Sequence, residues 1–73
     1  MHTYYFSLTL NYDECRVLYL PENNSVVVTE ERGKRIQIYT KNLRPFVSLT
    51  GLRGRFRLII NDEKKLVSLE KIS

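Results

Sequence analysis

The chain has 73 residues, of which 42% are hydrophobic and 27% charged, and its net charge is +4. This length favours one domain over residues 1–73, and the composition is too apolar for a disordered chain. The single cysteine, Cys15, excludes an internal disulfide, and no apolar run approaches the ~20 residues that span a bilayer. Because the first residues also lack the features of a signal peptide, we expect a cytoplasmic protein.

The charges are distributed unevenly along the chain. Residues 1–31 hold five acids and one base, whereas residues 32–61 hold eight bases and no acid. Such a separation indicates a basic surface that could contact a polyanion.

The first predicted elements are a strand over residues 4–10 and a short helix that ends near Leu20. The strand alternates apolar and polar residues, with Tyr4, Phe6, Leu8 and Leu10 on one face. Asn11 and Glu14 have the spacing of a capping box, and Pro21 ends the helix. We expect the spacing of Tyr12, Cys15, Leu18 and Tyr19 to place them on one helix face.

Two β-hairpins follow. The first joins residues 25–29 to residues 35–39 through a loop in which Gly33 takes a positive φ. Pairing Thr29 with Arg35 places Val28 opposite Ile36, Val26 opposite Ile38 and Lys34 opposite Glu30. The second hairpin joins residues 55–61 to residues 66–72. Pairing Asn61 with Leu66 sets Ile60 opposite Val67, Leu58 opposite Leu69 and Arg57 opposite Glu70.

Between the hairpins, residues 40–47 predict one helical turn, with Thr40 as its cap and Leu43 and Phe46 in the core. The order of elements is therefore β-α-β-β-β-β. This order predicts an α+β fold in which a curled antiparallel sheet, either open or closed into a small barrel, packs against one short helix.

Six short segments follow one another in a characteristic order and spacing. They are Tyr4-Tyr5-Phe6, Val26-Val27-Val28, Gly33-Lys34-Arg35-Ile36-Gln37, Leu43-Arg44-Pro45-Phe46, Gly51-Leu52-Arg53-Gly54-Arg55-Phe56 and Val67-Ser68-Leu69. In these segments the chain resembles a family of small uncharacterised proteobacterial proteins that is classed as a domain of unknown function. The resemblance covers nearly the whole chain. It implies a bacterial, cytoplasmic, single-domain protein, and it implies no activity.

The candidate functional residues are arginines and a lysine of the basic segment. Arg53, Arg55 and Arg57 alternate along a strand, which places their side chains about 7 Å apart on one face, and guanidinium groups bind phosphate oxygens well. Tyr5 and Tyr39 offer stacking surfaces nearby. The full candidate polyanion-binding set is Arg35, Lys41, Arg44, Arg53, Arg55 and Arg57. The competing interpretation is that these bases pair with carboxylates and only solvate the surface.

The other reactive residue types do not form a recognisable site. Cys15 lies on the predicted buried helix face without a histidine partner, and His2 is alone near the terminus. Asp62 and Glu63 lie in a loop without a cleft, and Gly51 and Gly54 do not have the spacing of a phosphate loop. We therefore expect no cofactor, no metal and no catalysis.

The sequence alone leaves two functions open. The first is a small basic module that contacts nucleic acid or another polyanion, such as an acidic protein surface, and no membrane. The alternative is a protein-interaction or self-association module that uses an open strand edge.

Overall fold

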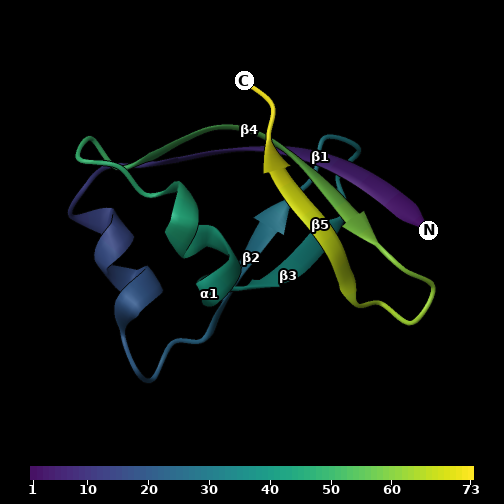
Figure 1. Cartoon of the computed structure of the whole chain (residues 1–73), viewed down its shortest axis with the longest axis horizontal. Helices are drawn as coiled ribbons and strands as arrows, with labels where there is room; N and C mark the ends of the chain where they lie inside the picture. Colours follow the sequence, from purple (N-terminus) through teal and green to yellow (C-terminus); the bar gives the residue numbers. More distant parts are fainter.

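The computed structural model describes all residues from 1 to 73 and confirms the α+β class (Figure 1). In chain order, the elements are β1 (His2–Leu10), η1 (Glu14–Tyr19), β2 (Ser25–Thr29), β3 (Arg35–Tyr39), α1 (Thr40–Leu43), η2 (Arg44–Phe46), β4 (Leu52–Ile60) and β5 (Leu66–Lys71). The strands form two antiparallel sheets, one of order β1-β4-β5 and one of order β2-β3. The strands therefore do not form one curled sheet, and they do not close into a barrel.

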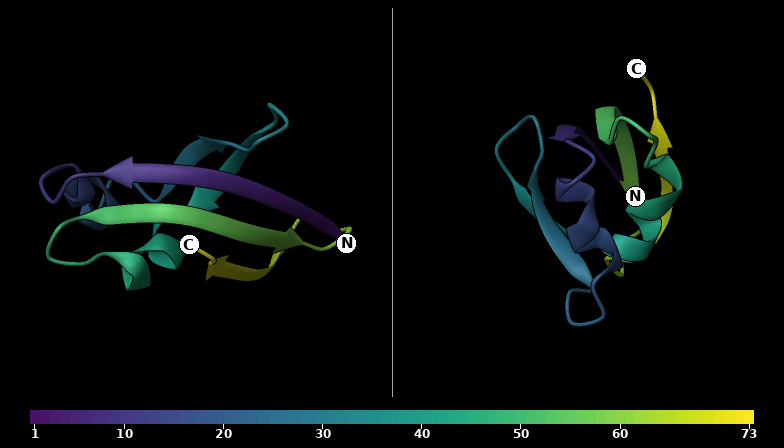
Figure 2. Two further views of the ribbon diagram at one scale, coloured as in Figure 1. Left: turned by 90° about the horizontal axis from the view of Figure 1, so that it is seen from above. Right: turned by 90° about the vertical axis from the view of Figure 1, so that its left-hand side faces the viewer.

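The longest pairing joins the first strand to the fourth, which lie far apart in the sequence. β1 runs antiparallel to β4 from His2 opposite Ile60 to Leu10 opposite Leu52, and Figure 2 shows the two strands side by side over their whole length. The residues of β1 and β4 that alternate toward the core include Phe6 and Phe56, whose rings stack with centroids 5.3 Å apart. The β1–β4 pair therefore forms one wall of the core.

The β2–β3 hairpin has the predicted register, with Thr29 opposite Arg35 and Val28 opposite Ile36. The Glu30 N–H donates to the Lys34 carbonyl at 2.8 Å, and Gly33 takes a φ of 98° at the last loop position. This is the three-residue loop that the glycine predicted. The predicted opposition of Lys34 and Glu30 is correct for the backbone, but the ion pair of Glu30 is made by Arg32 instead.

The β4–β5 hairpin closes through the same kind of loop, with Lys64 in the glycine position at a φ of 65°. Asn61 and Lys65 form the closing pair, because the Asn61 N–H donates to the Lys65 carbonyl at 2.9 Å. The register then shifts, so that Ile60 lies opposite Leu66 rather than opposite Val67 as predicted. A β-bulge absorbs one residue at this point, and the predicted pairs beyond it, Leu58–Leu69 and Arg57–Glu70, are confirmed.

The first helical segment begins with the predicted capping box. The Glu14 N–H donates to Asn11 Oδ1 at 2.7 Å, and the Asn11 N–H donates to Glu14 Oε1 at 2.9 Å. However, η1 is a 3₁₀-helix, whose three residues per turn place only Cys15 and Leu18 on the buried face. The prediction that Tyr12 and Tyr19 share one helix face with Cys15 and Leu18 is therefore wrong, because both tyrosines are exposed.

The turn between the hairpins consists of α1 and η2. Leu43 is fully buried, and the Phe46 ring packs edge-on against Phe56 at 5.3 Å, so both residues join the core as predicted. Thr40 does not cap the turn. Its side chain is buried, and its hydroxyl donates to the Asn23 carbonyl at 3.4 Å, which fixes the loop that precedes β2.

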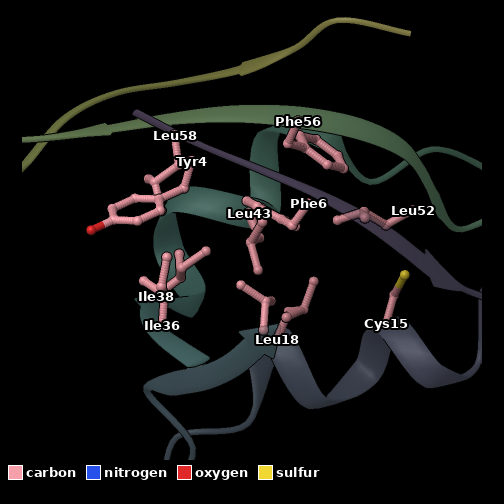
Figure 3. Close-up of a cluster of buried hydrophobic side chains, with 11 residues drawn as sticks. Tyr4, Phe6, Cys15, Leu18, Ile36, Ile38, Leu43, Leu52, Phe56 and Leu58 are labelled. Atoms are coloured by element: carbon pink, nitrogen blue, oxygen red, sulfur yellow. The ribbon is translucent and has the colours of Figure 1, made fainter. Parts of the chain in front are cut away.

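The core lies between the β1–β4 pair and the layer formed by η1, α1 and the β2–β3 hairpin. Figure 3 shows Cys15 and Leu18 pointing from η1 toward the β1–β4 pair. The buried apolar residues are Tyr4, Phe6, Cys15, Leu18, Val28, Ile36, Ile38, Leu43, Leu52, Phe56 and Leu58. The side chain of Leu69 is only partly buried, and those of Leu66 and Val67 are exposed. β5 is therefore the least covered strand.

Candidate functional site

The arginine row of β4 has the predicted geometry. Arg53, Arg55 and Arg57 lie opposite Thr9, Ser7 and Tyr5 of β1, on the face of the sheet that points away from the core. They alternate with the core residues of the same strand, because a pleated strand directs successive side chains to opposite faces. All three arginine side chains therefore lie on one face of β4. Their ability to bind an anion depends on whether carboxylates already pair with them.

Two of the three guanidinium groups are held by carboxylates. Arg55 donates to both Glu31 oxygens at 2.7 and 2.8 Å, and its guanidinium lies 4.7 Å from the centre of the Tyr5 ring. Arg57 donates to both oxygens of Glu70 at 3.0 and 3.1 Å. These hydrogen bonds raise the pKa of both arginines. Within this row, only Arg53 keeps an uncompensated charge.

The other three predicted residues lie elsewhere. Arg44, on η2, donates from Nε to the Leu18 carbonyl at 2.7 Å and thereby ties η2 to η1. Lys41 is exposed on α1 and makes no ion pair. Arg35 lies on β3, in the other sheet. The structure therefore does not bring the six predicted residues together into one surface.

A different basic surface forms between the two sheets, on the side where β3 and the β4–β5 hairpin do not pair. Two adjoining hollows of about 460 and 340 Å³ lie between β3 and the β4–β5 hairpin, and Gln37, Tyr39, Ile60 and Lys64 line both of them. We call these two hollows together the groove. Its apolar lining comes from core residues of both sheets, Ile36 and Ile38 on one side and Leu58 and Ile60 on the other.

Four cations line the groove, and none of them makes an ion pair. They are Lys34, Arg35, Lys64 and Lys65, and all four are exposed. Lys34 donates from Nζ to the Tyr4 hydroxyl at 3.1 Å, which holds its ammonium group at the groove without neutralising it. The one carboxylate in the lining, Asp62, accepts from the N-terminal amino group at 3.1 Å. The groove therefore carries a net positive charge.

Aromatic and backbone groups lie beside these cations. Tyr39 is 59% exposed, while Tyr4 forms a buried part of the wall. β3 is an edge strand, and the Glu30–Lys34 hydrogen bond shows that its even-numbered residues face β2. By alternation, the N–H and C=O groups of Arg35 and Gln37 point to the free edge. The groove thus offers charge, a ring face and unpaired backbone groups.

Of the residues that line the groove, Arg35 and Tyr39 were predicted from the sequence as candidates, whereas Lys34, Lys64 and Lys65 were not. Lys64 and Lys65 belong to a polar loop, which favours a solubility role when it is considered alone. In the structure, Lys64 is the only residue other than glycine with a positive φ. Strained backbone of this kind concentrates at functional sites. The approach of this loop to β3 is a tertiary feature without a local signature.

The fold and the groove define a small α+β domain with a basic hollow beside an open strand edge. Residues 2–72 match the family described as protein of unknown function DUF2835, and the chain therefore belongs to that family. The resemblance to a family without assigned activity is thus confirmed. No curated protein and no solved structure matches the chain. None of its helices has the length and apolar character needed to cross a membrane.

Proposed function

We propose that this domain is a non-enzymatic module that binds nucleic acid or another polyanion in the groove between β3 and the β4–β5 hairpin. The observation that carries the proposal is the set of four cations, Lys34, Arg35, Lys64 and Lys65, which come from two hairpins and have no carboxylate partner. Unpaired cations gathered in a concave surface raise the local concentration of a polyanion and speed its association. The arginine row on β4 has no comparable excess of positive charge, because Arg55 and Arg57 pair with carboxylates.

The bacterial, cytoplasmic setting that the family resemblance implies forms part of this proposal. Nucleic acids and polyphosphates are the abundant polyanions of that compartment. The unpaired cations of the groove favour the binding of an anion, and for this reason we propose binding rather than catalysis.

The test is a binding measurement with two probes, inorganic polyphosphate and a labelled single-stranded oligonucleotide. Both should bind, and the affinity should fall steeply with salt. Four phosphate contacts on a single strand predict a slope of about −3 in a plot of log K against log salt, because each contact contributes ~0.7. The triple variant Arg35→Gln, Lys64→Gly, Lys65→Gln should lose most of the binding of both probes and most of the salt dependence.

A matched control removes three charges elsewhere. Arg16, Arg53 and Lys71 are exposed, make no ion pair and do not line the groove. Their replacement by Gln lowers the net charge of +4 by the same three units. Binding should survive in this control. An equal loss in both triple variants, or no binding of either probe to the unaltered chain, would overturn the proposal.

A second candidate function, association through a strand edge, is favoured by β5. This strand lies at the edge of its sheet, and Leu66 and Val67 within it and Ile72 just after it are 39–48% exposed. Ile72 donates its N–H to the Arg55 carbonyl, so by alternation Leu69 and Lys71 direct their backbone groups away from β4. An open apolar edge of this kind can pair with a strand of another chain.

Association through β5 predicts a molar mass that rises with protein concentration and depends little on salt. Val67→Lys should abolish the rise, because a charge on an edge strand blocks pairing. Light scattering over a range of concentrations measures this directly. A constant monomer mass would remove this candidate and would leave the groove proposal untouched.

A further inference from the structure

We infer that the ligand of the groove is single-stranded nucleic acid, with one base stacked on Tyr39. This inference rests on the proposed function and narrows it from polyanions in general to one class. It is carried by three kinds of group that line one hollow: cations, an exposed aromatic ring and unpaired hydrogen-bonding groups. A single strand offers a partner for each of the three: phosphates for the cations, base faces for the ring and base edges for the hydrogen-bonding groups.

Tyr39 is the first of these observations. Its side chain lies on the last residue of β3, lines both hollows of the groove and is 59% exposed. The domain exposes other tyrosines, but not in the groove. The ring of Tyr5 is already covered by the guanidinium of Arg55, which lies 4.7 Å from the ring centroid. Tyr39 is therefore a free stacking surface beside the four unpaired cations.

Polar groups that could read a base edge lie next to Tyr39. The backbone N–H and C=O groups of Gln37 point to the free edge of β3, and the side chains of Gln37 and Asn42 line the groove. Gln37 donates from Nε2 to Ser25 at 2.7 Å, which fixes the orientation of its amide. A base stacked on the ring would bring its hydrogen-bonding edge near these groups.

Other classes of ligand would contact only some of these groups of the groove. In a duplex the base faces are hidden, so Tyr39 would have nothing to stack on. A linear polyphosphate has no aromatic group at all. An extended peptide could pair with the free edge of β3, but peptide backbone alone would not compensate the charges of Lys34, Arg35, Lys64 and Lys65.

The experiment compares Tyr39→Leu with Tyr39→Phe, since leucine removes the ring and phenylalanine keeps it. A labelled single strand of about 12 nucleotides is suitable, because it falls within the ~4–16 nucleotides that a single OB fold, another small β-domain, covers. Loss of one base–aromatic stack should weaken oligonucleotide binding about tenfold in Tyr39→Leu, and Tyr39→Phe should bind like the unaltered chain. Polyphosphate binding should not change in either variant. Thermal melting controls for folding, and the high exposure of Tyr39 predicts little effect.

The other outcomes distinguish failure of the stacking inference from failure of the proposed function. If Tyr39→Leu binds the oligonucleotide normally, or weakens polyphosphate binding equally, the stacking inference fails while polyanion binding stands. Equal affinity for a duplex of the same length, or for a polyglutamate peptide, also overturns the inference. Absence of polyphosphate and oligonucleotide binding together overturns the proposed function itself.

Discussion

Glu30 is the one carboxylate that the fold buries, with an exposed fraction of 3%. Its oxygens accept the Lys34 backbone N–H at 2.9 Å and Arg32 Nε at 3.3 Å. These hydrogen bonds, chiefly that from Lys34, hold the pKa of Glu30 below its ordinary value. Hydrogen bonds from Arg55 lower the pKa of Glu31 in the same loop. The tip of the β2–β3 hairpin is therefore stabilised by two ionised carboxylates.

These lowered pKa values predict how stability depends on pH. A carboxylate whose pKa is lowered by folding stabilises the protein above its unfolded pKa, about 4.3, and loses this effect as the pH falls through the folded pKa. The free energy of unfolding should therefore decline below about pH 4.5. Glu30→Gln should be less stable at neutral pH and should show a shallower decline. Urea unfolding across this range measures the effect, and Glu63→Gln, at an exposed site without an ion pair, should keep the original pH dependence.

Lys64 allows stability and binding to be separated. Its φ of 65° lies in the region that favours glycine. Lys64→Gly should therefore raise the free energy of unfolding by about 0.5–1 kcal/mol, which corresponds to a melting temperature several degrees higher in a domain of this size. The same change removes one groove cation and should weaken polyanion binding. A variant that is more stable and binds as well as the original would argue against a role for Lys64 in the groove.

At the scale of elements, the capping box decides where the first helical segment begins. Asn11→Ala removes the acceptor for the Glu14 N–H, and loss of such a cap costs about 1 kcal/mol. A melting temperature lower by about 4–8 °C is expected. Asp13→Ala is the matched control, because the Asp13 side chain makes no capping hydrogen bond. Equal effects of the two substitutions would mean that the reciprocal pair does not stabilise η1.

The hairpins show how far the sequence predicted these elements. The apolar residues Val26, Val28, Ile36 and Ile38 fix the β2–β3 register, because a shift of one residue would turn the apolar pair of one strand away from the core. Gly33 fixes the loop. The second hairpin lacks a glycine, so its three-residue loop and the bulge near Val67 were not predicted. The 3₁₀ form of η1 was missed because Cys15 and Leu18 fit both helix types.

At the scale of the molecule, the site was harder to predict than the elements. Alternation in β4 predicted the arginine row, and the hairpin register predicted the Arg57–Glu70 pair. The Arg55–Glu31 pair depends on how the two sheets approach each other, which no local pattern encodes. The groove depends on the same packing, because its walls come from β3 and from the β4–β5 hairpin. Sequence alone therefore predicted the positive charge and the arginine row, but it did not predict that the unpaired cations of two hairpins gather in the groove.

The long-range pairing predicts slow folding for so small a domain. Phe6 pairs with Phe56, and His2 pairs with Ile60, so the main sheet requires contacts between distant parts of the chain. Domains with such contacts refold in milliseconds to seconds. The chain has five tyrosines and no tryptophan, so stopped-flow tyrosine fluorescence can follow refolding. Completion within microseconds would contradict this expectation.

The pairing of β1 with β4 also matters while the protein is being made. The ribosome releases β1 first, but β4, its only sheet neighbour, follows after the whole β2–β3 hairpin. Until then, Tyr4, Phe6 and Leu8 have no strand against which to pack, and the nascent chain presents an apolar segment to its surroundings. A chaperone at the exit tunnel would encounter this segment before any other part of the core.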